Sequence, residues 1–231
     1  MGSNAGPKIP KVDNLKFYLD ALNPKSYPGT GNTWTDLSTA GIAGTKVGTT
    51  TFVGGGSTAS INIAGAGYYE FSNPSSLDIT PSITMNAIWM NKGWTSNWQT
   101  LFAKGDQSYR ISRDSTVAER GWYAIGIGPN TYWQTGIATS HGYDIWHMIT
   151  VVFDQPNSLV RFYNNGVATT SVERTSALTT NTDKLWVGNN PAQTTRQLNG
   201  NLAIVQFFDA PLSALEIQDL FASYKSRYNL T

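Results

Sequence analysis

Short apolar segments recur along most of the chain, and turn-forming residues separate them. The pattern predicts strands at residues 15–19, 61–63, 68–71, 83–90, 100–103, 109–112, 122–127, 147–153, 159–163, 184–188 and 202–208. Segments of this length and spacing are typical of a β-sandwich or barrel. Two longer connections are expected, at residues 23–51 and 169–183.

One hairpin has a sharp local signal. The apolar segment 159–163 is followed by Asn164-Asn-Gly166-Val167. An Asn-Gly pair supplies the positive φ angles that a two-residue hairpin turn needs. The sequence therefore predicts a tight hairpin at Asn165 and Gly166.

A helix is predicted near the C-terminus. Ser213 is its expected N-cap, Glu216 completes a capping box, and Leu212 can pack against Ile217 as a hydrophobic staple. The helix then presents one apolar stripe to a core, at Ile217, Leu220, Phe221 and Tyr224. The pattern as a whole predicts one sandwich domain with a single short helix.

Residues 1–12 form a separate segment before the predicted domain of residues 13–231. They are small, polar and interrupted by Pro7 and Pro10, which favours an extended arm. Only Ile9 and Val12 are sizeable apolar side chains, too few to offset about 1–2 kcal/mol of backbone ordering entropy per residue. We therefore expect an ordered arm to need another subunit, with contacts from Pro7, Lys8, Ile9, Pro10 and Lys11.

Composition and charge narrow the function classes. Charged residues are 13% of the chain, aromatic residues 12%, and there are 22 glycines, which suits strands joined by many turns. The net charge of +1 lacks the basic excess that nucleic-acid binding requires. The chain has no cysteine, hence no disulfide or thiolate metal site. Neither a secretory signal nor a long apolar run is evident, so we expect no membrane insertion.

Several segments together resemble the laminin-G-like, concanavalin-A-like domains of bacteriophage structural proteins. The resemblance is carried by residues 6–9, 17–29 and 33–38 at the start, by 75–79, 82–84 and 146–166 in the middle, including Arg161-Phe-Tyr-Asn-Asn-Gly166, and by 200–208 and 211–217 at the end. One departure is that residues 63–70 lack the acidic Asp-Gly-X-Asp-Asp segment of many relatives.

The resemblance implies an all-β fold, a two-sheet antiparallel jelly-roll sandwich whose first and last strands are close together. It also implies a virion component, either a head decoration protein or part of a tail or fibre, assembled in the cytoplasm of a bacterial host. Its partners would be other virion proteins or further copies of the chain.

Enzyme activity is not expected. Glycoside hydrolysis needs two carboxylates about 5–10 Å apart, and none of the glutamates has an acid two or four residues away. His141, in a predicted loop, and His147, at a strand start, lack the pattern of a nucleophilic triad. No cofactor is expected.

Metal sites are not expected either. Two histidines without any cysteine are too few ligands of the kind that zinc sites use. Calcium could use loop oxygens at Asp106, Asp114, Asp154 and Asn157, but these residues form no local acidic cluster and suit turns better.

Aromatic residues in Gly- and Asn-rich loops are the remaining candidates for a site. Ring faces stack on sugar C–H surfaces while neighbouring amides bond the hydroxyls. The candidates for carbohydrate binding are Trp94, Trp98, Tyr132 and Trp133, with a protein interface or ordinary packing as alternatives. The tryptophans within strand patterns are interpreted as core residues: Trp89, Trp122, Trp146 and Trp186.

Three functions follow in order of preference. The first is a non-enzymatic virion structural protein that acts through protein–protein contacts. The alternative is a lectin-like module that binds host-surface polysaccharide. A glycanase is a distant third.

Overall fold

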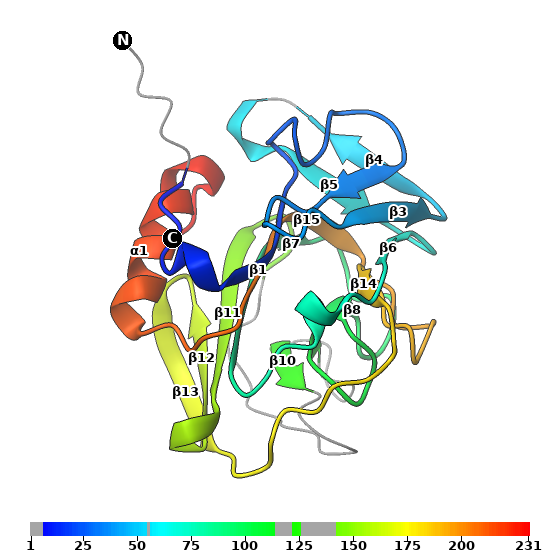
Figure 1. The fold of residues 1–231 in the computed structure, drawn as a ribbon. Coiled ribbons are helices and arrows are strands. Elements are labelled where there is room, and N and C mark those ends of the chain that lie inside the picture. The colour runs from blue at the N-terminus through cyan, green and yellow to red at the C-terminus, as the bar shows by residue number, and fades with distance from the viewer. Residues whose placement is uncertain (1–6, 55, 114–121, 126–141) are drawn as a thin grey trace.

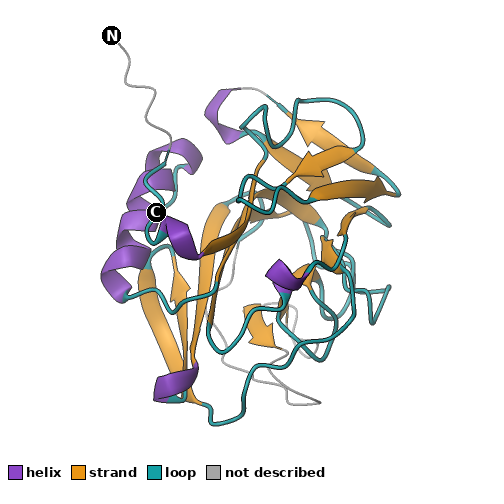
Figure 2. Ribbon diagram, in the orientation of Figure 1, coloured by secondary structure: helices purple, strands orange, loops and turns teal. Residues whose placement is uncertain are grey.

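The chain forms two antiparallel sheets that face each other in a sandwich (Figure 1). The structure is a computed structural model that describes residues 7–54, 56–113, 122–125 and 142–231, with the backbone alone at residues 57 and 122–125. Figure 2 distinguishes helices from strands by colour and shows α1 to one side of the strand layers. The architecture confirms the predicted two-sheet sandwich with one C-terminal α-helix.

The eight-stranded sheet forms the inner layer of the described fold. Its strand order is β13 (Val167–Glu173), β12 (Leu159–Asn164), β11 (Trp146–Asp154), β7 (Ile83–Asn91), β15 (Gly200–Phe208), β5 (Ser60–Ile63) and β4 (Thr50–Val53). Strand β1 (Leu15–Asp20) pairs with β15 beyond the stretch that pairs with β5. The first and last strands are therefore neighbours, as expected.

The seven-stranded sheet forms the second layer. Its order is β10 (Trp122–Ile125), β9 (Arg110–Arg113), β8 (Thr100–Ala103), β14 (Leu185–Val187), β6 (Tyr68–Phe71), β3 (Ala43–Val47) and β2 (Thr33–Thr35). Short 3-10 helices lie at Val12–Asn14, Gly56–Thr58, Ser75–Leu77 and Gln155–Asn157.

Aromatic rings fill the space between the sheets. Phe17 stacks on Phe207 with ring centroids 5.0 Å apart, and Phe71 and Phe102 contact the same pair edge-on. Each ring is fully buried. Fully burying one such side chain contributes about 1.5–3 kcal/mol, so this layer supplies much of the stability.

Helix α1 (Ala214–Tyr228) covers the other face of the eight-stranded sheet (Figure 1). Ile217, Leu220 and Tyr224 are buried there against strand residues such as Ile88 and Met148. The predicted capping box is confirmed, because Ser213 Oγ accepts from Glu216 N over 3.3 Å and Ser213 N donates to Glu216 Oε2 over 2.7 Å. Among the described residues, no helix is both long enough and apolar enough to cross a membrane.

The predicted hairpin is also confirmed, with φ angles of 48° at Asn165 and 76° at Gly166. The prediction that residues 23–51 and 169–183 are long connections without strands was wrong in part. Residues 23–51 contain β2, β3 and the start of β4, and residues 169–173 continue β13. These strands carry few apolar residues because one side of each is exposed, so they lack the signal of a core strand.

Candidate functional site

The seven-stranded sheet has one face toward the core and one face away from it, here called the outer face. Strand β6 alternates between buried Tyr69 and Phe71 and half-buried Tyr68 and Glu70. Strand β14 does the same, since Leu185 and Val187 enter the core while Trp186 is directed outward. Because successive side chains of a strand point to opposite faces, Tyr68, Glu70 and Trp186 meet on the outer face.

These three residues and Lys184 form a compact group, here called the platform. The rings of Tyr68 and Trp186 stack with centroids 4.1 Å apart and planes inclined by 24°. Glu70 Oε2 accepts from Trp186 Nε1 over 3.0 Å, and its Oε1 accepts from Lys184 Nζ over 2.6 Å. The carboxylate is thus fixed in position beside two aromatic rings.

The platform offers the groups that sugar recognition uses. Burial, and then the nearby Glu70 carboxylate, raises the pKa of the Tyr68 hydroxyl above 10, so it remains a hydrogen-bond donor at neutral pH. Because the two rings cover each other, the ring faces turned away from the stack are the apolar surfaces that sugar C–H groups would contact. Glu70 and Lys184 place an acceptor and a donor at its edge.

Cross-strand pairing extends the platform into a row of residues across the outer face, here called the row. Register places Thr33 opposite Thr45, Thr45 opposite Glu70, and Glu70 opposite Trp186. It continues from Trp186 to Ala103 and from Ala103 to Arg110. The row therefore runs through β2, β3, β6, β14, β8 and β9.

A polar cluster centred on Asp106 occupies the Arg110 end of the row; its residues are here called the wall. Asp106 Oδ1 accepts from Asn190 Nδ2 over 2.7 Å, from Arg196 Nη1 over 2.8 Å and from Arg110 Nη1. Since Arg110 lies in the row, the wall of Asp106, Arg110, Asn190 and Arg196 stands at that end of the outer face.

The predicted loop aromatics are only partly described. Trp94 and Trp98 lie in the connection between β7 and β8, as expected, and both are half-buried. The Arg113 guanidinium lies 4.5 Å from the Trp94 ring centroid, and that of Arg196 lies 5.6 Å from the Trp98 centroid. Trp98 thus contacts the wall. Tyr132 and Trp133 lie outside the described residues, so sugar binding by the loop group stays a prediction.

The interpretation of Trp186 as a core residue was wrong. Strand alternation assigns its two neighbours to the core and leaves the indole on the outer face. Trp89 is fully buried between the sheets, and Trp146 packs half-buried against the cluster beneath α1. The Trp122 side chain lies outside the described residues. The alternation in residues 68–71 was the available signal for Tyr68 and Glu70.

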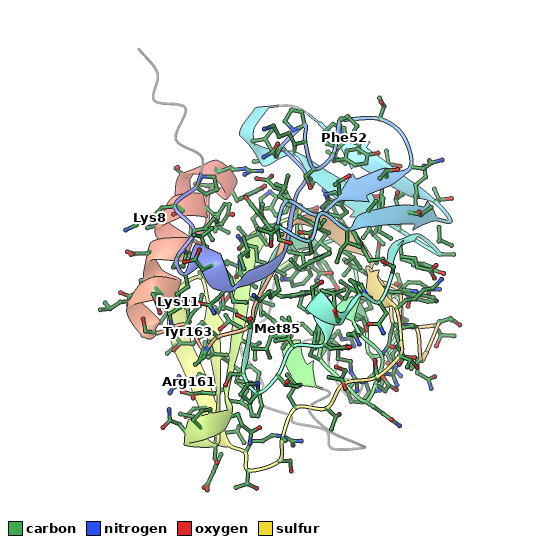
Figure 3. The ribbon with its side chains drawn as sticks, viewed as in Figure 1. Lys8, Lys11, Phe52, Met85, Arg161 and Tyr163 are labelled. Carbon is green, nitrogen blue, oxygen red and sulfur yellow. The ribbon has the colours of Figure 1, made fainter. Side chains whose placement is uncertain are left out.

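The arm residues lie along helix α1 of their own chain, and Figure 3 shows Lys8 and Lys11 beside it. The Lys8 carbonyl accepts from Ser223 Oγ over 3.1 Å, and Lys11 Nζ donates to the Pro211 carbonyl over 2.9 Å. Ile9 packs partly buried on the α1 cluster. The expectation that an ordered arm needs a neighbour is therefore wrong for residues 7–11, because the polar side of α1 supplies partners. Contact of Pro7 to Lys11 with another subunit stays a prediction.

The acidic residues considered for calcium have protein partners where the structure describes them. Asp106 belongs to the wall, and Asp154 accepts from Arg161 Nη2 over 3.2 Å and from Asn157 Nδ2 over 2.9 Å. Asp114 and His141 lie outside the described residues. Within the described part of the chain, no group of three or more His, Asp or Glu residues could hold a metal ion.

The solved structures that are similar in fold to this chain include binding domains of toxins. Botulinum neurotoxin type C, which depends on interaction with two ganglioside molecules for entering cells, matches with a TM-score of 0.70 and 15% identity over 92% of this chain and 51% of that one. The binding domain of botulinum neurotoxin DC, solved with rat synaptotagmin II, matches with 0.69 and 14% over 92% and 52%. The binding domain of Paraclostridial Mosquitocidal Protein 1 matches with 0.66 and 16% over 92% and 53%.

The present chain spans about half the length of these neighbours, and at such identities the likeness concerns the fold. Among curated protein sequences no match was found. A family model described as the concanavalin A-like lectin/glucanases superfamily matches residues 64–218, which is more than half of the chain. These residues include the platform and the wall. The chain therefore belongs to the laminin-G-type branch of the concanavalin A-like lectin/glucanases superfamily.

Proposed function

We propose that the protein is a carbohydrate-binding module and that its platform is the sugar-binding surface. The observation that carries the proposal is the stacked pair of Tyr68 and Trp186 beside a fixed Glu70 carboxylate. A sugar ring would stack its C–H groups on the aromatic surface while its hydroxyls bond Glu70, Lys184 and the Tyr68 hydroxyl. The ganglioside dependence of one structural neighbour supports this reading.

Binding is favoured over cleavage by the surroundings of Glu70. Hydrolysis requires a second carboxylate about 5–10 Å away. The two residues that flank Glu70 in the row are Thr45 and Trp186, and both of its carboxylate oxygens already accept hydrogen bonds. Release of new reducing ends from a bound polysaccharide would contradict a purely binding role.

A glycan array with single variants tests the proposal. We expect the wild-type protein to bind a subset of surface glycans and Trp186→Ala to lose at least about 2 kcal/mol of binding free energy, a factor of about 30 in Kd. Tyr143→Ala removes an exposed aromatic ring outside the row and serves as the matched control. Circular dichroism of each variant checks that the fold is kept.

The Trp98→Ala variant separates the platform from the predicted loop site. If Trp98→Ala loses binding while Trp186→Ala binds normally, the sugar site lies in the loop, and the proposal that the platform binds sugar is wrong. Absence of binding by the wild-type protein to any glycan would overturn the carbohydrate function.

A second proposal is that the module is part of a virion, as a head decoration or a tail or fibre component. Its support is the sequence resemblance over residues 6–231. A virion component with a sugar-binding outer face would serve host adsorption. Electron micrographs of particles labelled with an antibody to this chain test the location, and unlabelled particles from a producing host would contradict it.

A further inference from the structure

Exposure falls steadily along the row. Thr33 and Thr45 are exposed, Glu70 and Trp186 are half-buried, and Ala103 and Arg110 are 0% and 1% exposed. All six belong to one register line on one face of the sheet. The outer face is therefore open at β2 and closed at β8 and β9.

The closed end begins immediately beyond Trp186. Ala103 is the cross-strand partner of Trp186, and its side chain is too small to project above the sheet. Its complete burial means that other atoms cover it. The wall stands at the next position of the row, where Arg110 and Arg196 both bond Asp106. The Arg196 guanidinium also lies 5.6 Å from the centroid of the Trp98 ring.

The open end leads to further polar groups. From Trp186 through Glu70 and Thr45 to Thr33 the row crosses three strand spacings, about 14 Å, which leaves room for a short run of sugar rings. At the β2 edge, Thr33 and Thr35 line a hollow of about 330 Å³ together with Ser26, Thr30 and Asn32. Hydroxyl and amide groups of this kind bond sugar hydroxyls.

We propose that the row recognises the end of a glycan chain and not an internal stretch. The terminal ring lies over Trp186 and Tyr68 against the wall, and the following rings pass over Glu70 and Thr45 toward the hollow. The wall prevents the chain from continuing past β8. This inference rests on the proposed carbohydrate function and specifies which part of the glycan is bound.

A length series separates end binding from internal binding. The glycan that binds best on the array is prepared as the intact polymer and as size-fractionated fragments, and each competes with an immobilised copy of the polymer. Since each chain supplies one end of the correct kind, we expect potency per unit mass to rise about tenfold when the mean chain length falls about tenfold. Potency per chain end should stay constant down to short fragments.

The opposite result overturns end recognition without affecting the proposed function. Potency that follows total mass at every length, or that falls as the chains shorten, would show binding to internal units. Chemical modification of the terminal ring at one end and then at the other identifies the end that enters, and retained binding after modification of both ends would also overturn it.

The wall is tested with Arg196→Ala, whose side chain is largely buried between Asp106 and Trp98. Because Arg110 and Asn190 still bond Asp106, we expect the fold to be kept while the closed end opens. The potency of the polymer relative to the fragments should then rise. If the potency of the polymer relative to the fragments is unchanged in a folded Arg196→Ala variant, the wall does not prevent the glycan from extending past β8.

Discussion

Arg227 near the end of α1 binds Asp20 at the end of β1 with two hydrogen bonds, from Nη1 to Oδ2 over 2.8 Å and from Nη2 to Oδ1. Only 14% of the Arg227 side chain and 5% of the Asp20 side chain are exposed. Tyr18 also donates to Asp20, over 3.1 Å, and burial raises the pKa of the Tyr18 hydroxyl, so it stays a donor. The pair fixes the helix to the first strand.

Replacing Arg227 by Met should lower the free energy of unfolding by about 3 kcal/mol, because a buried carboxylate loses its charged partner. Urea denaturation measures the loss. The matched control is Lys8→Met, which breaks the exposed ion pair with Asp219 and should change stability by less than about 0.5 kcal/mol. Equal effects of the two substitutions would contradict the role of the Asp20 pair.

Gly166→Ala should destabilise the protein through both backbone strain and a clash. The residue has a φ of 76°, and an added Cβ would lie 2.8 Å from Phe221 Cβ on α1. We expect a loss of about 2–3 kcal/mol in chemical denaturation. Gly31→Ala, with a φ of 94° and open space around the added carbon, separates the two causes and should cost less. A smaller loss for Gly166→Ala than for Gly31→Ala would be the contrary result.

Ser213→Ala removes the side-chain acceptor for the Glu216 amide and should lower stability by about 1 kcal/mol. Ser226→Ala, at an exposed position inside the same helix, should cause no loss. Thermal or urea denaturation of both variants measures the two losses of stability. A Ser213→Ala protein as stable as the wild type would show that the cap is dispensable.

His147 should make stability depend on pH. Burial lowers its pKa from 6.5 to about 4. Between these two pKa values the unfolded chain binds more protons at His147 than the folded chain does. The free energy of unfolding is therefore undiminished by His147 above pH 6.5 and falls as the pH decreases toward 4. The expected loss of unfolding free energy at pH 4.5 that His147 causes is about 2.5 kcal/mol.

Urea denaturation at pH 7 and 4.5 measures this contribution. His147→Gln should reduce the loss on acidification, while titration of carboxylates affects both proteins alike. An identical loss in the variant would assign the pH dependence to other groups.

Local signals in the sequence determined much of the fold. The Asn165–Gly166 turn and the Ser213 and Glu216 capping box act over four residues, and both are present as predicted. Long strands such as β7 and β15 are buried along their length, and apolar runs in the sequence therefore predict them. These features depend on backbone conformation and burial of neighbouring residues, which a short window of sequence specifies.

Strands β2, β3 and β4 had no such signal. Each has exposed positions between its buried or half-buried ones, and threonine, glycine and lysine fill much of their length. They are strands because β3 pairs with β6 and β4 pairs with β5. Their stability comes from partners elsewhere in the chain, which propensity does not reveal.

The candidate site was decided by tertiary structure alone. Trp186 donates to Glu70 across a separation of 116 residues, because β14 lies beside β6 in the sheet. Sequence alternation could show that Tyr68 and Glu70 share a face, but strand order is needed to bring the indole to them. The same holds for the wall, where Arg196 meets Asp106 from 90 residues away. The sequence by itself determined the local elements and the family resemblance, whereas long-range strand pairing determined which polar and aromatic side chains share one surface.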